Sequence, residues 1–431
     1  MRVAVVGGGV TGLTVALELA RRHHEVFLYE RGRVGGLAMG FKYPGFPDIY
    51  LDKFYHHIFT TDNEVVRLVE QFGLANDLMW LPSRTGLIAE GRIWPLGGAL
   101  DLMRFAPLGK LWQRFLMGFN LLHLRRMDDW HSLDGLRCRE FFELRKNLVG
   151  YRNLWEPLLK RKFADSYDDI PAAFLWGRIH PRSRSRGKDG ELLGYLRGGF
   201  QRLLDRMTQA FCEAGGTLHT GCPVLGVTQG SNPKVETKQS TQMFDRIVWT
   251  ASLDRLARCL QNSPAGFNKK EQAIDYMGVT QLILILKRRQ SGYYWLNCID
   301  LDMSFGGIIE HTNLVSPEHY GGEHILYIVN YHRQDDSAFV GKPASVLLDM
   351  HLPSLEQVFS EFRVDDILRL YCFHDQHSSP LYNLGFVERI PPYHGWLAGI
   401  DFCGMPQVYP IDRSMNYCIA NALHYARERY G

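Results

Sequence analysis

The sequence has few cysteines, and none of them is arranged as a metal site or a redox pair. Its eight cysteines are scattered over 431 residues, and no two of them form a C-x-x-C motif. This argues against a zinc site, a dithiol redox centre and a disulfide framework, and it fits a reducing cytoplasm. We therefore predict a cytoplasmic protein without a bound metal ion.

Long apolar runs and a strong charge of one sign are absent as well. No stretch reaches the ~18 consecutive apolar residues of a membrane span, and Met1-Arg2 leads into a glycine turn instead of a signal peptide. The formal net charge is only +3, which argues against a nucleic-acid partner. The basic amphipathic segment 91–127 leaves three interpretations open: peripheral membrane contact, a cap over an apolar substrate tunnel, or packing on its own domain.

The sequence does contain a strand–turn–helix–strand unit at its start. "RVAVVG" and "EVFLYE" predict buried parallel strands, and residues 10–21 between them have apolar residues at helical spacing. Gly7, Gly9 and Gly12 fit the G-x-G-x-x-G motif, with the phosphates of a dinucleotide at the helix N-terminus. Glu30 ends the second strand, where a carboxylate binds both ribose hydroxyls and disfavours the 2′-phosphate of NADP.

A second glycine pair follows this acidic residue, in "ERGRVGGLA" at residues 30–38. The stretch resembles the acid-then-double-glycine motif of flavoproteins of the amine oxidase and protoporphyrinogen oxidase superfamily, which includes phytoene desaturases and UDP-galactopyranose mutase. The resemblance implies non-covalent FAD instead of NAD, because NAD-only Rossmann domains lack the second glycine pair. Leu37 stands where many relatives carry an arginine.

Three further segments, at residues 194–207, 215–227 and 397–426, extend the resemblance over the whole chain. It implies that the backbone of Val224 contacts adenine and that Asp401 or Asp412 binds the ribityl chain. It also implies that a helix starting at Met415 faces the isoalloxazine ring. The complete set of residues expected to bind FAD is Gly7, Gly9, Val10, Thr11, Gly12, Glu30, Arg31, Gly35, Gly36, Leu37, Ala38, His57, Val224, Asp401, Asp412, Met415 and Asn416.

The implied fold is α/β, with an FAD/NAD(P)-binding Rossmann-like three-layer domain and a second substrate domain of mixed sheet and helices. We expect the FAD-binding domain to be discontinuous, with residues 1–65, 190–255 and 385–431. The substrate domain would then comprise residues 66–189 and 256–384. Residues 66–190 are expected to be mostly helical.

Three functions remain open at this point. The favoured one is an oxidoreductase that moves a hydride from a C–N or C–C bond of a small organic substrate to flavin N5. The alternative is a redox-neutral flavoenzyme that acts on a nucleotide sugar, because "FYHHIFTTD" resembles a segment of UDP-galactopyranose mutase. The third is a flavin-binding protein without catalytic activity.

The candidate catalytic residues are two pairs of neighbours, His56 with His57 and Glu310 with His311. Adjacent histidines on a strand point to opposite faces, so at most one of the first pair would face the flavin. Such a histidine could tune the flavin charge or move a proton, or could be a hydrogen-bonded residue at a domain junction. The candidate substrate residues are Arg178 and Arg182, whose guanidinium groups suit a diphosphate or carboxylate, and the aromatic residues Trp176 and Tyr195.

Overall fold

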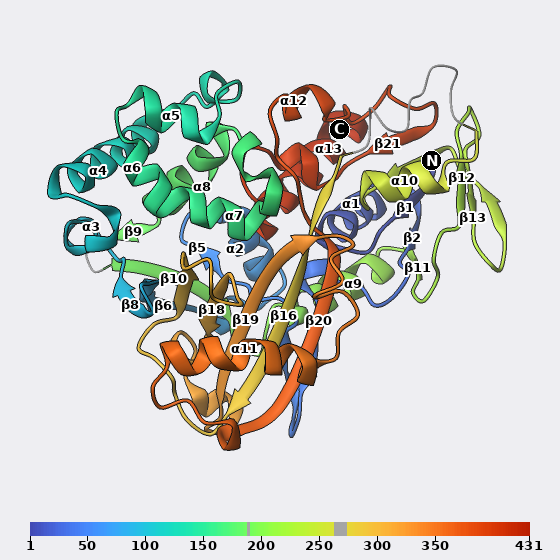
Figure 1. The fold of residues 1–431 in the computed structure, drawn as a ribbon. Coiled ribbons are helices and arrows are strands. Elements are labelled where there is room, and N and C mark those ends of the chain that lie inside the picture. Colours follow the sequence, from blue (N-terminus) through green and yellow to red (C-terminus); the bar gives the residue numbers. More distant parts are fainter. Residues whose placement is uncertain (188–189, 263–273) are drawn as a thin grey trace.

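The fold is built around a five-stranded parallel sheet in a computed structural model that describes residues 1–187, 190–262 and 274–431. Its strand order is β11-β2-β1-β15-β21, and every neighbouring pair is parallel. The strands are β1 (Arg2–Val6), β2 (Glu25–Tyr29), β11 (Thr217–His219), β15 (Arg246–Trp249) and β21 (Ile400–Phe402). Three separate stretches of the chain therefore meet in one sheet (Figure 1).

Side chains that alternate along β1 pack into two different cores. Val3 and Val5 lie in the core that contains helices α1 (Val10–Arg21), α9 (Gln201–Glu213) and α13 (Met415–Tyr430). Ala4 and Val6 lie in a second core, with valines of a small antiparallel sheet. That sheet consists of β12 (Gly226–Thr228), β13 (Lys234–Glu236) and β14 (Thr241–Met243). Helices, parallel sheet and small sheet form the three layers that the sequence predicts.

A seven-stranded mixed sheet forms the second large unit, in the order β20-β16-β19-β18-β17-β7-β8. All its pairs are antiparallel except β17 with β7. On one face, Leu282 and Leu284 pack against helix α11 (Ala344–Val358), whereas Ile283 and Ile285 face the opposite core. The strands are β7 (Thr85–Ala89), β8 (Arg92–Pro95), β16 (Tyr276–Leu286), β17 (Trp295–Cys298), β18 (Gly307–Glu310), β19 (His324–Arg333) and β20 (Ile367–Pro380).

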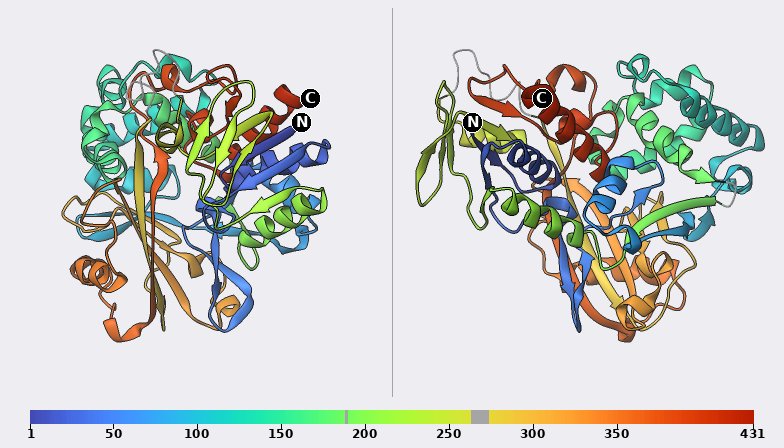
Figure 2. Two further views of the ribbon diagram at one scale, coloured as in Figure 1. Left: turned by 90° about the vertical axis from the view of Figure 1, so that its right-hand side faces the viewer. Right: turned by 180° about the vertical axis from the view of Figure 1, so that it is seen from behind.

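A group of helices lies at one end of the molecule, beside the seven-stranded sheet (Figures 1 and 2). Its members are α3 (Ala99–Arg104), α4 (Leu111–Arg126), α5 (Cys138–Leu144), α6 (Leu148–Gly150), α7 (Glu156–Phe163) and α8 (Ala172–Arg184). The expectation that residues 66–190 are mostly helical is wrong for β7, β8 and β6 (Leu78–Ser83). β7 and β6 form because they pair with distant partners, β17 and β10 (Gly190–Leu196), and β8 pairs with its neighbour β7.

Shorter elements connect these units. They are β3 (Gly40–Tyr43), β4 (Phe46–Asp52), β5 (Ile58–Phe59), β9 (Arg186–Gly187), α2 (Asn63–Gln71), α10 (Leu253–Cys259) and α12 (Phe386–Arg389). Two distinct large sheets are in keeping with the expected two-domain arrangement, and the exact boundaries stay a prediction. In the part of the chain that the structure describes, no helix has the length and apolarity needed to cross a membrane.

Candidate functional site

The first glycine cluster forms the tight turn between β1 and α1. Gly7 has φ = +112°, a conformation that favours glycine. A Cβ on Gly12 would overlap the carbonyl oxygen of Gly7, so the third glycine permits close packing of the helix on the strand. A Cβ on Gly9 would meet no protein atom closer than the Cα of Gly36, 4.0 Å away. Gly9 therefore keeps open a space that the protein itself does not fill.

The second glycine cluster lies directly against the first. Gly35 donates its N–H to the carbonyl oxygen of Gly8 at 2.8 Å, and both Gly35 (φ = +137°) and Gly36 (φ = +55°) are in the positive-φ region. A Cβ on Gly36 would come within 3.1 Å of the Cα of Gly9. The two clusters are therefore one backbone surface without side chains, on which a Cβ at Gly36 would crowd Gly9.

This surface lines a cavity of about 370 Å³, which we call cavity 1. The N-termini of α1 and α13 both open into it, and neither N-cap residue, Gly9 or Ser414, caps its helix with a side-chain hydrogen bond. Free N–H groups and the positive ends of two helix dipoles thus face one space. Predicted FAD residues that line it are Gly7, Gly9, Val10, Thr11, Gly12, Arg31, Gly35, Gly36, Leu37, Ala38, His57, Asp412 and Met415.

Glu30 lies next to this surface, at the end of β2. Its two carboxylate oxygens accept the N–H groups of Gly8 and Gly32, both at 2.8 Å. Each oxygen keeps a further lone pair, so the fixed carboxylate can still accept hydrogen bonds from ribose hydroxyls. A glycine surface without side chains, two helix N-termini and an oriented acid are what a dinucleotide with a second polar end requires, and these residues fit FAD.

Besides Glu30, three residues expected at the cofactor do not line cavity 1. Val224 packs in the core beneath the small antiparallel sheet. Asp401 is fully buried, accepts a hydrogen bond from the hydroxyl of Tyr425 and lies 3.8 Å from Arg246. Asn416 accepts the N–H groups of residues 64 and 65 and so caps helix α2. The side chains of Asp401 and Asn416 therefore turn into the protein, whereas the contact expected from Val224 is one of its backbone and stays a prediction.

The two histidines lie in a loop between β4 and β5 and not on a strand, so both line cavity 1. Burial lowers the pKa of His56 to about 4 and, together with nearby Arg182, the pKa of His57 to about 3. His56 donates its Nδ1 proton to the carbonyl oxygen of Phe54 at 2.6 Å. Both imidazoles are therefore neutral near pH 7, and neither can supply a positive charge to a cofactor.

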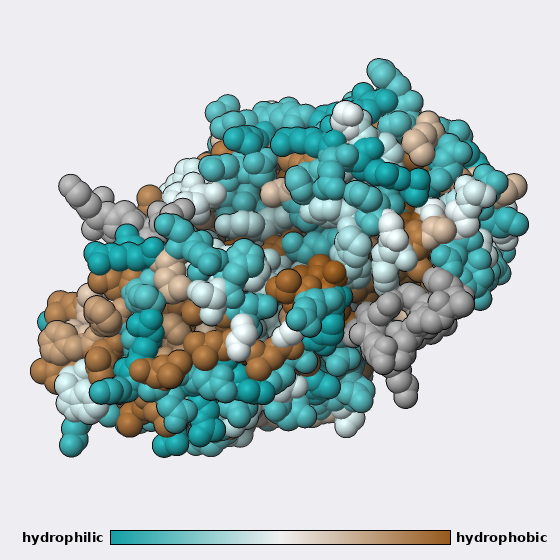
Figure 3. Space-filling view, turned by 90° about the horizontal axis from the view of Figure 1, so that it is seen from above, coloured by the Kyte–Doolittle hydropathy of each residue, from teal (hydrophilic) through white to brown (hydrophobic). Residues whose placement is uncertain are grey.

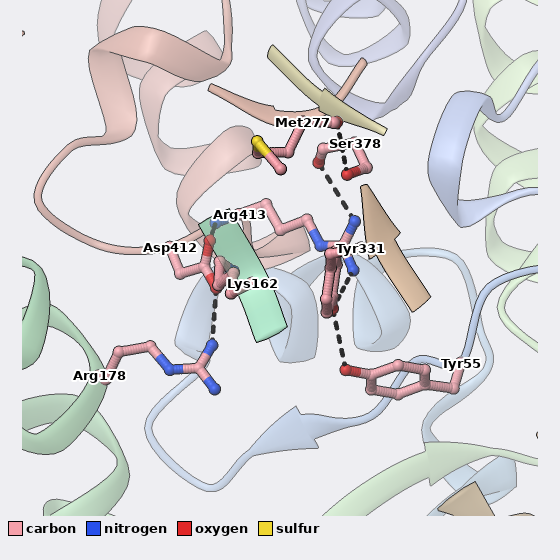
Figure 4. Close-up of polar contacts among 8 residues, drawn as sticks. All are labelled: Tyr55, Lys162, Arg178, Met277, Tyr331, Ser378, Asp412 and Arg413. Carbon is pink, nitrogen blue, oxygen red and sulfur yellow. Dashed lines mark hydrogen bonds and ion pairs between the residues drawn. The ribbon is translucent and has the colours of Figure 1, made fainter. Parts of the chain in front are cut away.

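Asp412, a candidate for the ribityl contact, lies at the wall of cavity 1 within a buried charge cluster (Figure 4). Its Oδ2 accepts from Lys162 Nζ at 2.5 Å and from Arg178 at 2.7 Å. Burial alone would raise the pKa of Asp412, but Lys162, Arg178 and Arg413 hold it well below its usual range. Asp412 is thus a permanent anion that fixes two cations.

A pair of tyrosines next to this cluster was not singled out by the sequence (Figure 4). The hydroxyl of Tyr331 accepts from Arg413 at 2.8 Å and lies 3.4 Å from the hydroxyl of Tyr55. Burial raises the pKa of Tyr55 well above its ordinary value. Burial would do the same to Tyr331, but Arg413 and Lys162 lower its pKa below the ordinary value. Tyr331 is therefore the acidic member of the pair. No motif marks it, because the partners lie far apart in the sequence.

A second cavity of about 910 Å³, cavity 2, adjoins the first. Its walls come mainly from apolar residues of α3, α4, α7 and the seven-stranded sheet. The residues that line both cavities are Tyr55, Arg178, Arg182, Trp295 and Tyr331. We call this shared wall the junction.

Of the predicted substrate residues, Arg178 and Arg182 line cavities 1 and 2, and both bind carboxylates. Arg182 forms a two-pronged contact with Glu191, at 2.6 and 2.8 Å. Trp176 donates to the carbonyl oxygen of Met127 in the helical unit, and Tyr195 donates to Asp52 in the core. Neither aromatic residue lines cavity 1 or cavity 2.

The second predicted catalytic pair is also placed away from both cavities. Glu310 accepts the N–H groups of Gln290 and Ser291, at 2.7 and 2.8 Å, and holds the loop before β17. The imidazole of His311 is buried and bonds to the hydroxyl of Tyr320 at 2.7 Å. Both residues stabilise the sheet end and are too enclosed to touch a ligand in either cavity.

Comparisons with known proteins agree with this geometry. The model of the family described as "Flavin containing amine oxidoreductase" matches residues 10–396. A solved structure from Exiguobacterium sp. 255-15, named after protoporphyrinogen oxidase, has a TM-score of 0.76 and 17% identity, covering 99% of this chain and 98% of that one. An oxidoreductase from Methanosarcina mazei has a TM-score of 0.74 and 15% identity, covering 99% of this chain and 100% of that one. Reduced UDP-galactopyranose mutase has a TM-score of 0.72 and 12% identity, covering 99% of this chain and 93% of that one.

A short local match adds to these. A stretch of 38 residues is 47% identical to the "Uncharacterized protein in nifH2 3'region" of Methanothermococcus thermolithotrophicus, and it covers 9% of this chain and 37% of that protein's length. The match therefore concerns a small part of both chains.

Proposed function

Because the chain belongs to the flavin-containing amine oxidoreductase family and its cofactor is FAD, we propose that it oxidises a C–C unit of an elongated, largely apolar substrate. The observation that carries the proposal is the junction. A glycine-lined cofactor cavity and an apolar cavity share five lining residues, so a molecule in cavity 2 has one end at the cofactor.

The charges around cavity 2 favour a neutral or anionic substrate over an amine. Among the described residues that line this cavity, none is an aspartate or glutamate, whereas five are basic: Arg125, Arg161, Lys162, Arg178 and Arg182. Lys162, Arg178 and Arg182 already bind carboxylates, but no carboxylate on the wall of cavity 2 is left to bind a protonated amine, and the loss of its water there costs free energy. This supports the C–C alternative over the C–N alternative.

Tyr331 is the group proposed to take the proton. Removing two hydrogens from neighbouring carbons releases a hydride and a proton, and FAD supplies the acceptor for the hydride. The electron pair of the second C–H bond forms the new double bond, and the phenolate of Tyr331 accepts the proton. Arg413 and Lys162 favour this phenolate because they lower the pKa of the phenol.

Anaerobic reduction of the bound FAD tests the proposal. The FAD-loaded protein is mixed with neutral, anionic and cationic fractions of a total lipid extract, and absorbance near ~450 nm is followed. We expect bleaching with a neutral or anionic fraction and a product two mass units lighter than its substrate. Bleaching by the cationic fraction alone would favour a C–N bond instead.

The redox-neutral alternative has one observation in its favour, the arginines at the junction, which would suit a diphosphate. Each of them already binds a carboxylate, which weakens that argument. A mutase-like reaction would need prior reduction by dithionite and would leave the mass of the substrate unchanged. The same experiment therefore separates the two functions.

A further inference from the structure

Helix α4 carries large apolar side chains on the face that points to solvent. At about 100° per residue, five of them form a stripe about 100° wide along the helix. The exposed fractions are 56% for Leu111, 52% for Trp112, 61% for Phe115, 63% for Phe119 and 37% for Leu122. The residues that α4 buries, on the nearly opposite side, are Gln113, Met117, Asn120 and Leu124. A helix that exposes aromatic residues and buries two amides is not arranged for water on its outer face.

Positive charge surrounds this stripe. Residues 102–127 contain no aspartate or glutamate but five basic residues, Arg104, Lys110, Arg114, Arg125 and Arg126, although the whole chain is nearly balanced with 49 basic and 46 acidic residues. All of these except Arg114 are exposed. Figure 3 shows hydrophobic residues gathered at the left-hand end of the molecule, the end where α3 and α4 lie in Figure 1. Aromatic and leucine side chains flanked by arginine and lysine are typical of helices that lie in the interface of an anionic bilayer.

The stripe is continuous with the apolar cavity. Phe115, Phe119 and Leu122 belong to the stripe and also line cavity 2. The other end of this cavity is the junction, with Tyr55 and Tyr331. One apolar route therefore runs from the exposed face of α4 to the cofactor cavity.

We propose that the α3–α4 face docks on an anionic lipid bilayer and that the substrate enters cavity 2 from the bilayer, between Phe115 and Phe119. The identity of what enters rests on the proposed function, whereas the docking does not. A second copy of this chain is a poorer occupant, because two such faces would bring ten basic residues together with only Asp101 of α3 as an acidic residue on each. A bilayer offers both an apolar interior and negative headgroups.

Flotation with lipid vesicles tests the docking directly. The FAD-loaded protein is mixed with vesicles of phosphatidylcholine, with and without a third of phosphatidylglycerol, and the floating fraction is measured. We expect strong binding only with phosphatidylglycerol. The double variant Leu111→Ser/Trp112→Ser, which changes two stripe residues outside cavity 2, should weaken binding at least about tenfold. The triple variant Arg104→Gln/Lys110→Gln/Arg126→Gln should weaken it about 100-fold, at about fivefold per charge.

The control variant is Leu225→Ser/Met243→Ser. These residues are 48% and 54% exposed. Met243 ends β14, and Leu225 directly precedes β12 and donates its N–H to the carbonyl oxygen of Glu236 in β13, at the opposite end of the molecule (Figure 1). The control should float like the wild type, and all variants should keep their FAD and their unfolding temperature. The proposal would be overturned if Leu111→Ser/Trp112→Ser floats as strongly as the wild type, or if the wild type does not float at all. If the wild type does not bind vesicles but forms a dimer, and Leu111→Ser/Trp112→Ser makes that dimer dissociate, the face would be assigned to a second copy of this chain. Flavin bleaching is measured separately, so docking and oxidation can fail independently.

Discussion

Replacing Gly9 with valine tests the cofactor surface more directly than any other single change. The backbone of Gly9 is extended (φ = −73°, ψ = −179°), which valine adopts readily, and its Cβ would have no protein neighbour closer than 4.0 Å. The fold therefore accepts the Cβ without a protein clash, and we expect a cost of about 1 kcal/mol for a poorer helix N-cap. The two methyl groups would occupy the space between the glycine clusters, where a phosphate must approach the backbone.

Losing two charge-assisted hydrogen bonds to phosphate, at about 1.5–3 kcal/mol each, weakens FAD binding by about 10²- to 10⁴-fold. The assay is the ratio of absorbance near ~450 nm to protein after purification, with unfolding compared in FAD-free samples. Gly135→Val is the matched control, because Gly135 is exposed and a Cβ there meets nothing within 4 Å. FAD retained by Gly9→Val at the wild-type ratio would refute the assignment of this surface.

Three further outcomes are expected. Gly12→Ala should destabilise the protein even without FAD, in thermal unfolding, because its Cβ overlaps the carbonyl oxygen of Gly7. Tyr331→Phe should slow anaerobic FAD reduction about 10²- to 10⁴-fold and abolish its increase with pH; an unchanged pH profile would remove Tyr331 as the base. Burial raises the pKa of Asp52 to about 7 in the folded protein, so folding is favoured less as pH rises from about 4 to about 7, by up to about 4 kcal/mol. Asp52→Asn should lose that part of the pH dependence in denaturant titrations at pH 5 and pH 8, and an unaltered difference would contradict the raised pKa.

The local parts of the cofactor surface could be predicted from the sequence, because glycine spacing fixes backbone geometry within a short stretch. Gly7, Gly9 and Gly12 need only the strand and helix on either side of them, and Gly35 follows a few residues after Glu30. The same reasoning fails for side chains whose direction depends on tertiary packing. Asn416 lies at the first turn of α13, as expected, but its amide caps another helix.

The junction could not be predicted, because its chemistry comes from long-range encounters. Tyr331 lies on a strand and Tyr55 in a loop, 276 residues apart in the chain. Arg413 gives Tyr331 its lowered pKa across 82 residues. Pattern and spacing carry no record of such pairings. The sequence instead favours the histidines next to Tyr55 as catalytic residues, because the ordinary pKa of histidine is near neutrality. Burial lowers the pKa of both histidines far below that range.

The charge cluster around Tyr331 predicts that two substitutions shift the pH dependence of FAD reduction in opposite directions. Arg413 lowers the pKa of this phenol, whereas Asp412 raises it. Arg413→Gln should therefore shift the increase of FAD reduction with pH to higher pH, and Asp412→Asn should shift it to lower pH. Both variants disturb buried ion pairs and should be less stable. A loss of stability alone would lower the rate of FAD reduction, but it would not shift the midpoints of the two pH profiles in opposite directions. The midpoints are measured by anaerobic stopped-flow absorbance on FAD-loaded protein. Midpoints that coincide with the wild type would show that the cluster does not set the pKa of the base.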